Sequence, residues 1–156
     1  MSAPGNMFEA IAATAPRATS YGRRATDLRI GAHAVAVLRS RADFEALAGE
    51  WQDLEANCSG ALFFQSAGWV RSVFDFEAAR GNADFDPVIV TLREADGLKA
   101  ILPLERTRTR LRTLLVPLGD RYSQISDALV ADDMPARDTL GPMLRAAIAA
   151  APAALV

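Results

Sequence analysis

The pattern of apolar and polar residues predicts two consecutive helices in the first half of the chain. Apolar residues recur three or four positions apart between Ser40 and Asn57 and again between Ser66 and Gly81, which is the spacing of one buried helix face. A serine at the first position of each segment favours a helix N-cap, because its hydroxyl can accept a hydrogen bond from a free backbone N–H. The expected buried residues are Phe44, Leu47, Ala48, Trp51, Leu54, Trp69, Val70, Val73 and Phe74.

Continuous apolar runs predict β-strands further along the chain. Val88–Leu92 and Leu98–Leu104 are joined by a polar turn at Asp96-Gly97. An Asp-Gly pair between two apolar runs is the strongest short-range signal of a hairpin, because glycine adopts the positive φ of a tight turn. Shorter apolar runs predict three further strands, which are His33–Arg39, Thr113–Leu118 and Tyr122–Val130.

A last helix is predicted over residues 136–150, with Gly141-Pro142 placing its expected start after Arg137. The resulting order is β-α-α-β-β-β-α, with Tyr122–Val130 as an additional sheet strand. This order predicts an α/β (α+β) fold with a mixed, mostly antiparallel sheet.

Length and composition fit one folded domain with flanking segments. The chain has 156 residues, of which 51% are apolar, and its net charge of −2 selects no class of charged partner. Residues 1–32 are rich in small and polar residues and are expected to form a flexible leader. Residues 33–150 are the predicted domain, and residues 151–156 are a predicted tail.

Scarce residue types exclude several classes of site. Cys58 is the only cysteine and His33 the only histidine, so we expect no internal disulfide and no metal site. We expect Cys58 to be a structural thiol rather than a nucleophile, and His33 to lie at a strand end. No apolar run reaches the roughly 18 residues of a membrane span, and a cytoplasmic location is the expectation that follows.

Arginines at alternate positions are the first candidate binding residues. Arg106, Arg108, Arg110 and Arg112 would project from one face of a strand. Such a row could bind phosphate or an acidic polysaccharide, and a charged edge strand that resists aggregation is the alternative. No aromatic residues lie among these arginines, so we expect no nucleic-acid binding by base stacking.

Several motifs in fixed order resemble those of the GNAT acyltransferase superfamily, and more specifically the CelD-like acetyltransferases associated with cellulose biosynthesis. The resemblance covers residues 35–150. The residues that carry it are Phe44-x-x-Leu47, Trp51-x-x-Leu54, Phe63-Phe64-Gln65, Trp69, Asp96-Gly97, Ala100 to Leu104, Leu118-Gly119 and Tyr122 to Leu129.

The resemblance implies a GNAT-like fold, acyl transfer from acetyl-CoA or another acyl-CoA to an amine, and two catalytic residues. Tyr122 would donate a hydrogen bond or a proton, and Asp127 would accept an amine proton; structural roles for both are the alternative. Since proteins of this group are about twice as long, the resemblance also implies a truncated, N-terminal half-domain. Its expected partner is a second acyltransferase-like half or a second copy of the chain.

The expected position of the coenzyme A loop departs from the family pattern. The family has a Gln/Arg-x-x-Gly-x-Gly/Ala loop there, whereas residues 131–137 contain Asp132, Asp133 and Pro135. Two carboxylates beside a pyrophosphate would be repulsive. We therefore assign no cofactor-binding residues and expect the chain alone to be catalytically incomplete. The alternative function is a non-catalytic module that binds acidic polysaccharide, through Arg106, Arg108 and Arg110, or a protein partner.

Overall fold

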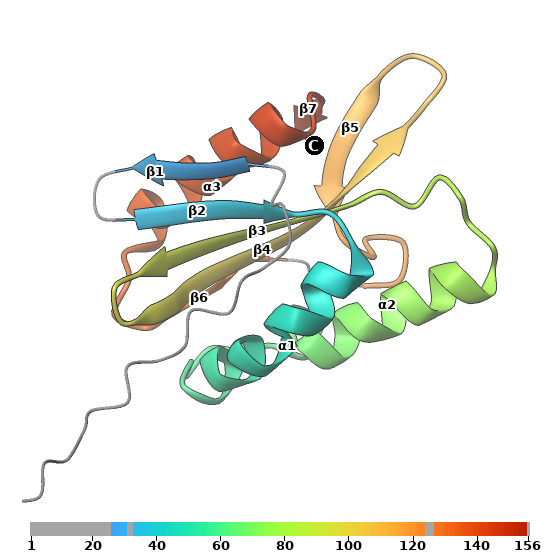
Figure 1. The fold of residues 1–156 in the computed structure, drawn as a ribbon. Helices are drawn as coiled ribbons and strands as arrows, with labels where there is room; N and C mark the ends of the chain where they lie inside the picture. The colour runs from blue at the N-terminus through green and yellow to red at the C-terminus, as the bar shows by residue number, and fades with distance from the viewer. Residues whose placement is uncertain (1–25, 31–32, 124–126, 156) are drawn as a thin grey trace, which may run out of the picture.

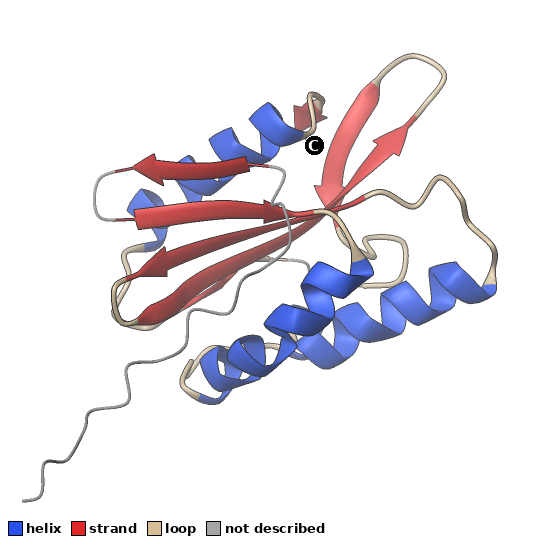
Figure 2. Ribbon diagram, viewed as in Figure 1, coloured by secondary structure: helices blue, strands red, loops and turns tan. Residues whose placement is uncertain are grey.

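A mixed sheet lies between helices on both of its faces (Figures 1 and 2). The structure is a computed structural model and describes residues 26–30, 33–123 and 127–155. Helix α3 covers one face of the sheet, and helices α1 and α2 cover the other (Figure 1). The helices are α1 (Arg41–Ala56), the short 3-10 helix η1 (Phe63–Gln65), α2 (Ala67–Ala79) and α3 (Ala136–Ala150).

The sheet is mostly antiparallel, as the sequence predicts. Its strands are β1 (Thr26–Ile30), β2 (His33–Leu38), β3 (Pro87–Glu94), β4 (Gly97–Arg108), β5 (Thr113–Pro117), β6 (Leu129–Val130) and β7 (Ala154–Leu155). They follow the order β1-β2-β3-β4-β5-β7, and β6 also pairs with β4. Among the strands of the described residues, the pairing of β5 with β7 is the only parallel one.

Two hydrophobic cores explain why the central strands are continuously apolar. On β3, Val88 and Val90 pack in the core beneath α3, while Ile89 packs in the core beneath α1 and α2. Alternate side chains of a strand point to opposite faces, so a strand covered on both faces is apolar at successive positions. The β3–β4 hairpin is confirmed: Glu94 pairs with Gly97, and Gly97 has a φ of 138°.

The two predicted N-caps are confirmed. The Ser40 hydroxyl accepts a hydrogen bond from the backbone N–H of Asp43 at 3.1 Å, and the Ser66 hydroxyl accepts one from Trp69 at 3.0 Å. The Trp51 ring is fully buried, and its indole N–H donates to the Gln65 carbonyl at 2.9 Å. Capping and burial together fix where both helices begin and which face they turn toward the sheet.

The sheet extends further at both ends of the chain than the sequence indicates. Residues 26–30, within the predicted leader, form β1 and pair with residues 33–37 of β2, whereas residues 1–25 lie outside the described residues. Residues 154 and 155, within the predicted tail, form β7 beside β5. Pairing of this kind satisfies backbone N–H and C=O groups that an open sheet edge would leave without partners.

The prediction of a strand over Tyr122–Val130 is wrong. Gly119, with a φ of 72°, begins a turn in which the N–H groups of Tyr122 and Ser123 both donate to its carbonyl, at 2.8 and 3.1 Å. Of the described residues in this segment, only Leu129–Val130 pairs with β4, as the short strand β6. Leu129 supplies the apolar character of this segment by packing beneath α1 and α2.

The predicted start of the last helix is also wrong, because α3 begins at Ala136 and contains Pro142 in its interior. The first turn is held by the Pro135 carbonyl, which accepts hydrogen bonds from the N–H groups of Asp138 and Thr139, both at 3.1 Å. The Thr139 hydroxyl donates to the same carbonyl at 2.9 Å. Pro142 therefore removes a backbone donor only after the helix is established.

Candidate functional site

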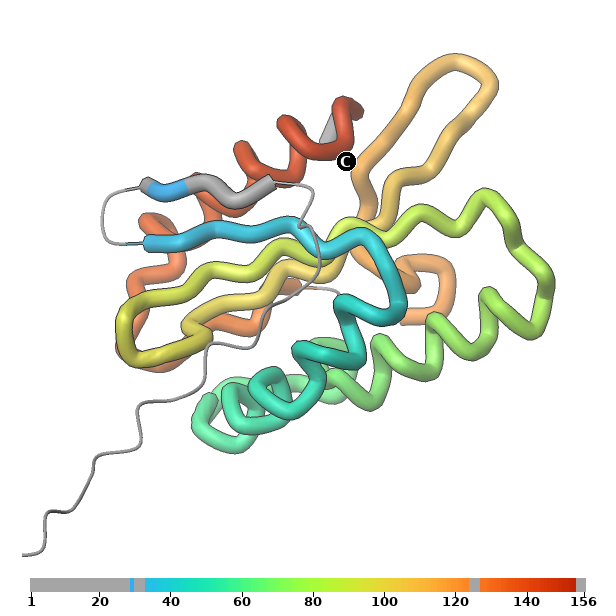
Figure 3. Tube along the Cα trace, viewed as in Figure 1, coloured from blue at the N-terminus to red at the C-terminus, as the bar shows by residue number. Residues whose placement is uncertain are grey.

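A cleft of about 770 Å³ opens beside the end of β4. β3 pairs with β4 only as far as Glu105, whereas β4 continues to Arg108 with β5 on its other edge. The chain between α2 and β3, which can be followed in Figure 3, diverges from the β4–β5 hairpin instead of pairing with the end of β4. Residues 80, 82–86, 105–108 and 121 line the cleft.

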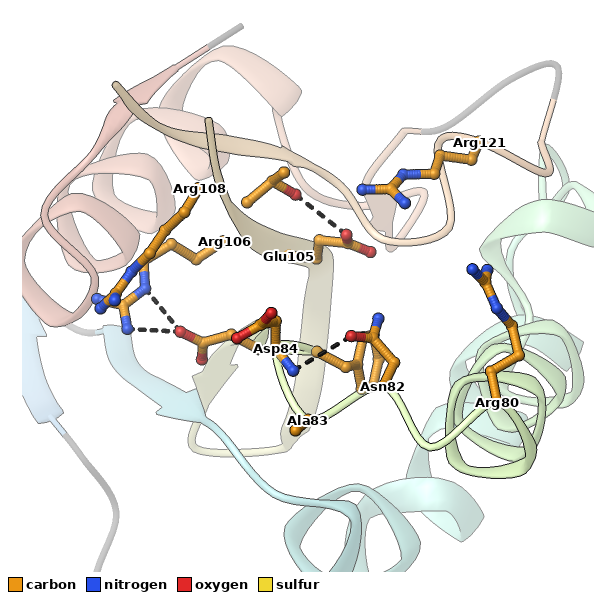
Figure 4. Close-up of a pocket in the computed structure, with 11 residues that line it drawn as sticks. Arg80, Asn82, Ala83, Asp84, Glu105, Arg106, Arg108 and Arg121 are labelled. Atoms are coloured by element: carbon orange, nitrogen blue, oxygen red, sulfur yellow. Dashed lines mark hydrogen bonds and ion pairs between the residues drawn. The ribbon is translucent and has the colours of Figure 1, made fainter. Parts of the chain in front are cut away.

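Four arginines line the cleft, from three separate parts of the fold. Figure 4 shows Arg106 and Arg108 of β4 on one side of it and Arg80 and Arg121 on the other. Arg80 is the C-terminal cap residue of α2, and Arg121 lies in the turn that follows β5. Within the residues that the structure describes, neither Arg108 nor Arg121 forms an ion pair. These two guanidinium groups are therefore the ones most available to a ligand.

Asp86 neutralises the arginine nearest the sheet. Its carboxylate accepts a hydrogen bond from Arg106 Nε at 2.6 Å and forms an ion pair with Arg39. Arg39 also donates to the backbone carbonyls of Pro87, at 2.9 Å, and Ala150, at 3.1 Å. This group of charges joins β2, β3, β4 and the end of α3, so Arg106 is mainly part of the wall of the cleft.

A buried carboxylate holds the opposite wall. Glu77 is 5% exposed, and it accepts hydrogen bonds from Asn82 Nδ2 at 2.6 Å and from the Tyr122 hydroxyl at 3.0 Å. The same hydroxyl accepts a hydrogen bond from Arg80 Nη1 at 2.8 Å. Burial acts to raise the pKa of Glu77, but the two hydrogen bonds and the positive charges of Arg80 and Arg121 outweigh it and lower that pKa. An ionised Glu77 therefore fixes Arg80 at the cleft.

The two residues that the resemblance makes catalytic lie in different places. Tyr122 belongs to the Glu77 network beside the arginine cleft, and its ring packs against Phe76 with centroids 5.0 Å apart. Asp127 accepts a hydrogen bond from the N–H of Ala128 at 2.7 Å and lines a separate cavity of about 190 Å³. The structure therefore does not bring them together as an acid–base pair.

The predicted row of four arginines is reduced to two on the strand. Arg106 and Arg108 lie on β4 and line the cleft, whereas Arg110 lies in the turn between β4 and β5. The turn is closed by Thr109, whose hydroxyl donates to the Arg112 carbonyl at 2.8 Å. A turn reverses the chain direction, so the alternation that would align four side chains ends at Arg108.

Residues 131–137 do not fit a coenzyme A pyrophosphate. The Asp132 carboxylate accepts a hydrogen bond from the N–H of Ser59 at 3.1 Å, and Asp133 forms an ion pair with Lys99 at 2.7 Å. Hydrogen bonds from Lys99 to Asp133 and Asp96 raise the pKa of the lysine, which stays charged and engaged. The loop thus presents carboxylates that are already bound within the fold.

The contacts of Cys58 and His33 are those of structural residues and not of a nucleophile or a catalytic base. The Cys58 thiol donates to the Val130 carbonyl at 3.4 Å, and burial, followed by the negative charges of Asp132 and Asp133, raises its pKa. A raised pKa reduces the thiolate fraction that a nucleophile needs. His33, the first residue of β2, lies 3.1 Å from the carboxylate of Glu94.

No family model, curated protein or solved structure matches this chain. Among the described residues, no helix combines the length and apolarity needed to cross a membrane. Over the same ranges, no three acidic, histidine or cysteine side chains gather as a metal site would require. The arginine cleft is consequently the feature with the clearest chemistry.

Proposed function

We propose that this domain is a binding module for anionic ligands that carry phosphate or carboxylate groups, and that the arginine cleft is its binding site. One observation supports this most directly: Arg108 and Arg121 line a cleft of about 770 Å³ without a carboxylate partner of their own among the described residues. Guanidinium groups bind phosphate and carboxylate through paired N–H donors. An acidic polysaccharide is one ligand of this class.

The expected affinity is modest. A hydrogen bond to a charged group contributes about 1.5–3 kcal/mol, so two arginines contribute roughly 3–6 kcal/mol. Such a free energy corresponds to a dissociation constant from a few millimolar to tens of micromolar. Repeated anionic groups on one polymer would raise the apparent affinity through multivalency.

The test is a titration with inorganic phosphate, followed by amide chemical shifts in ¹⁵N-labelled protein. The shifts should concentrate in residues 80–86, 105–108 and 121, and Arg108→Ala and Arg121→Ala should each weaken binding about tenfold. Arg145→Ala is the matched control, because Arg145 is exposed on α3 and does not line the cleft. The proposal would be contradicted if all three variants weakened phosphate binding equally, or if the amide shifts concentrated in residues outside the cleft.

A second candidate is an acyltransferase-like domain whose cleft receives the amine acceptor. The resemblance to CelD-like proteins favours it, and residues 131–137 favour a form in which acyl-CoA binds to a second half or a second copy of the chain. This chain alone should then give no heat of binding when titrated with acetyl-CoA. Sub-micromolar binding to the isolated chain would contradict that form of the proposal.

A further inference from the structure

We infer that the natural ligand of the arginine cleft is zwitterionic: its anionic group is bound by one of the two arginines on opposite sides of the cleft, Arg108 or Arg121, and its ammonium group by the carboxylates between them, Asp84 and Glu105. This inference rests on the proposed function and narrows the ligand class. A site for a uniformly negative polymer has no use for acidic side chains between its arginines, because each would repel the ligand.

Both carboxylates are available to a ligand. Among the described residues, neither Asp84 nor Glu105 forms an ion pair. Glu105 accepts one hydrogen bond, from the Thr107 hydroxyl at 3.1 Å, and Asp84 donates its backbone N–H to Asn82 at 3.2 Å. Figure 4 shows both acidic residues between Arg106 and Arg108 on one side and Arg80 and Arg121 on the other.

The charges that remain after internal pairing are nearly balanced. Four arginines and three carboxylates line the cleft. Asp86 is shared by Arg106 and Arg39, and the buried Glu77 lies 4.0 Å from Arg80, so both lining arginines have a carboxylate partner. The two remaining positive charges, Arg108 and Arg121, are then equal in number to the two remaining negative charges, Asp84 and Glu105. A ligand with one charge of each sign satisfies this arrangement, whereas a simple anion satisfies only half of it.

The strand geometry explains how one short segment supplies both charges. Successive side chains of a strand point to opposite faces, so Glu105 and Thr107 share one face of β4 while Arg106 and Arg108 share the other. The cleft lies beside the edge of β4 that β3 leaves open beyond Glu105, and it is therefore reached by side chains from both faces.

The experiment compares two probes that differ only in the amine, O-phosphoethanolamine and ethyl phosphate, by the same amide-shift titration. Two partly exposed ion pairs contribute about 0.2–1 kcal/mol each, which predicts roughly two- to thirtyfold tighter binding of O-phosphoethanolamine. The double variant Asp84→Asn with Glu105→Gln keeps the shapes of the side chains. It should abolish this preference and bind ethyl phosphate at least as tightly as the original chain does.

The outcomes separate the two proposals. Equal binding of both probes in the arginine cleft would overturn the zwitterion inference and leave the anion-binding function intact. Binding of neither probe would overturn both. A preference that survives in the double variant would also overturn the inference, because the ammonium group would then be recognised elsewhere. Circular dichroism of each variant checks that the fold is retained.

Discussion

Replacing Asp86 with Asn tests two roles of this carboxylate: it stabilises the fold by pairing with Arg39 and Arg106, and it compensates the charge of Arg106 in the cleft. The substitution keeps the size of the side chain and removes the negative charge that binds Arg39 and Arg106. We expect two effects at once. The protein should lose stability, because two guanidinium groups lose their counter-charge, and the cleft should bind phosphate more tightly, because the charge of Arg106 is no longer compensated.

The expected loss of unfolding free energy follows from the hydrogen bonds that Asp86 accepts from Arg39 and Arg106. A hydrogen bond to a charged partner contributes about 1.5–3 kcal/mol and a neutral one about 0.5–1.5 kcal/mol, so each arginine loses roughly 1 kcal/mol. The Asp86 side chain is 26% exposed, which limits solvent screening. The free energy of unfolding should therefore fall by about 2 kcal/mol, and the melting temperature by roughly 4–8 °C for a domain of this length.

Urea unfolding, followed by the fluorescence of Trp51 and Trp69, measures this loss of unfolding free energy. Asp75→Asn is the control: its carboxylate also pairs with an arginine, Arg41, but it is 59% exposed and should lose less than about 1 kcal/mol. If both variants lose the same free energy, the reasoning about the Asp86 cluster is refuted. Unchanged phosphate affinity in Asp86→Asn would refute the claim that this residue compensates a charge in the cleft.

Three further predictions concern packing and titration. Gly119→Ala should lower the unfolding free energy by about 1–3 kcal/mol in urea, because φ is 72° and a Cβ would lie 2.9 Å from Val73 Cγ2; Gly49→Ala, in open space within α1, should not. Glu77→Gln should lower the free energy of unfolding most near pH 7 and progressively less as pH falls below about 4.5. The pKa of Glu77 is lowered in the fold, so its ionised form stabilises the protein and that stabilisation is lost as the carboxylate becomes protonated. Alkylation of Cys58 by iodoacetamide at pH 8 should be slower than that of a cysteine in a short peptide, because its pKa is raised.

The elements with strong local signals could be predicted from the sequence. The helices follow from apolar spacing and serine caps, and the β3–β4 hairpin from Asp96-Gly97, because these signals act within a few residues. β1, β6 and β7 could not be predicted in the same way. Two of them have only two residues, and all three form because a neighbouring strand offers unpaired backbone groups.

The cleft could be predicted only in part. Alternation on β4 indicated Arg106 and Arg108, but Arg80 and Arg121 are distant in sequence and meet them only through the fold. The pairing of Arg106 with Asp86 lowers its value as a ligand contact, and no local pattern reveals that pairing. The sequence does place an acidic residue, Glu105, directly before the run of arginines, and this is a local signal of mixed charge at the cleft.

The length of β4 gives the molecule two electrical poles. Its 12 residues span roughly 40 Å, from the acidic pocket at Gly97 to the arginine cleft at Arg108. The pocket at the first pole has one lysine among five carboxylates. Although the net charge is −2, the negative charges gather at one end of β4, so the protein should orient in an electric field. Near an anionic surface, it should rotate so that its acidic pocket points away and the arginine cleft faces the surface, and added salt should weaken that orientation.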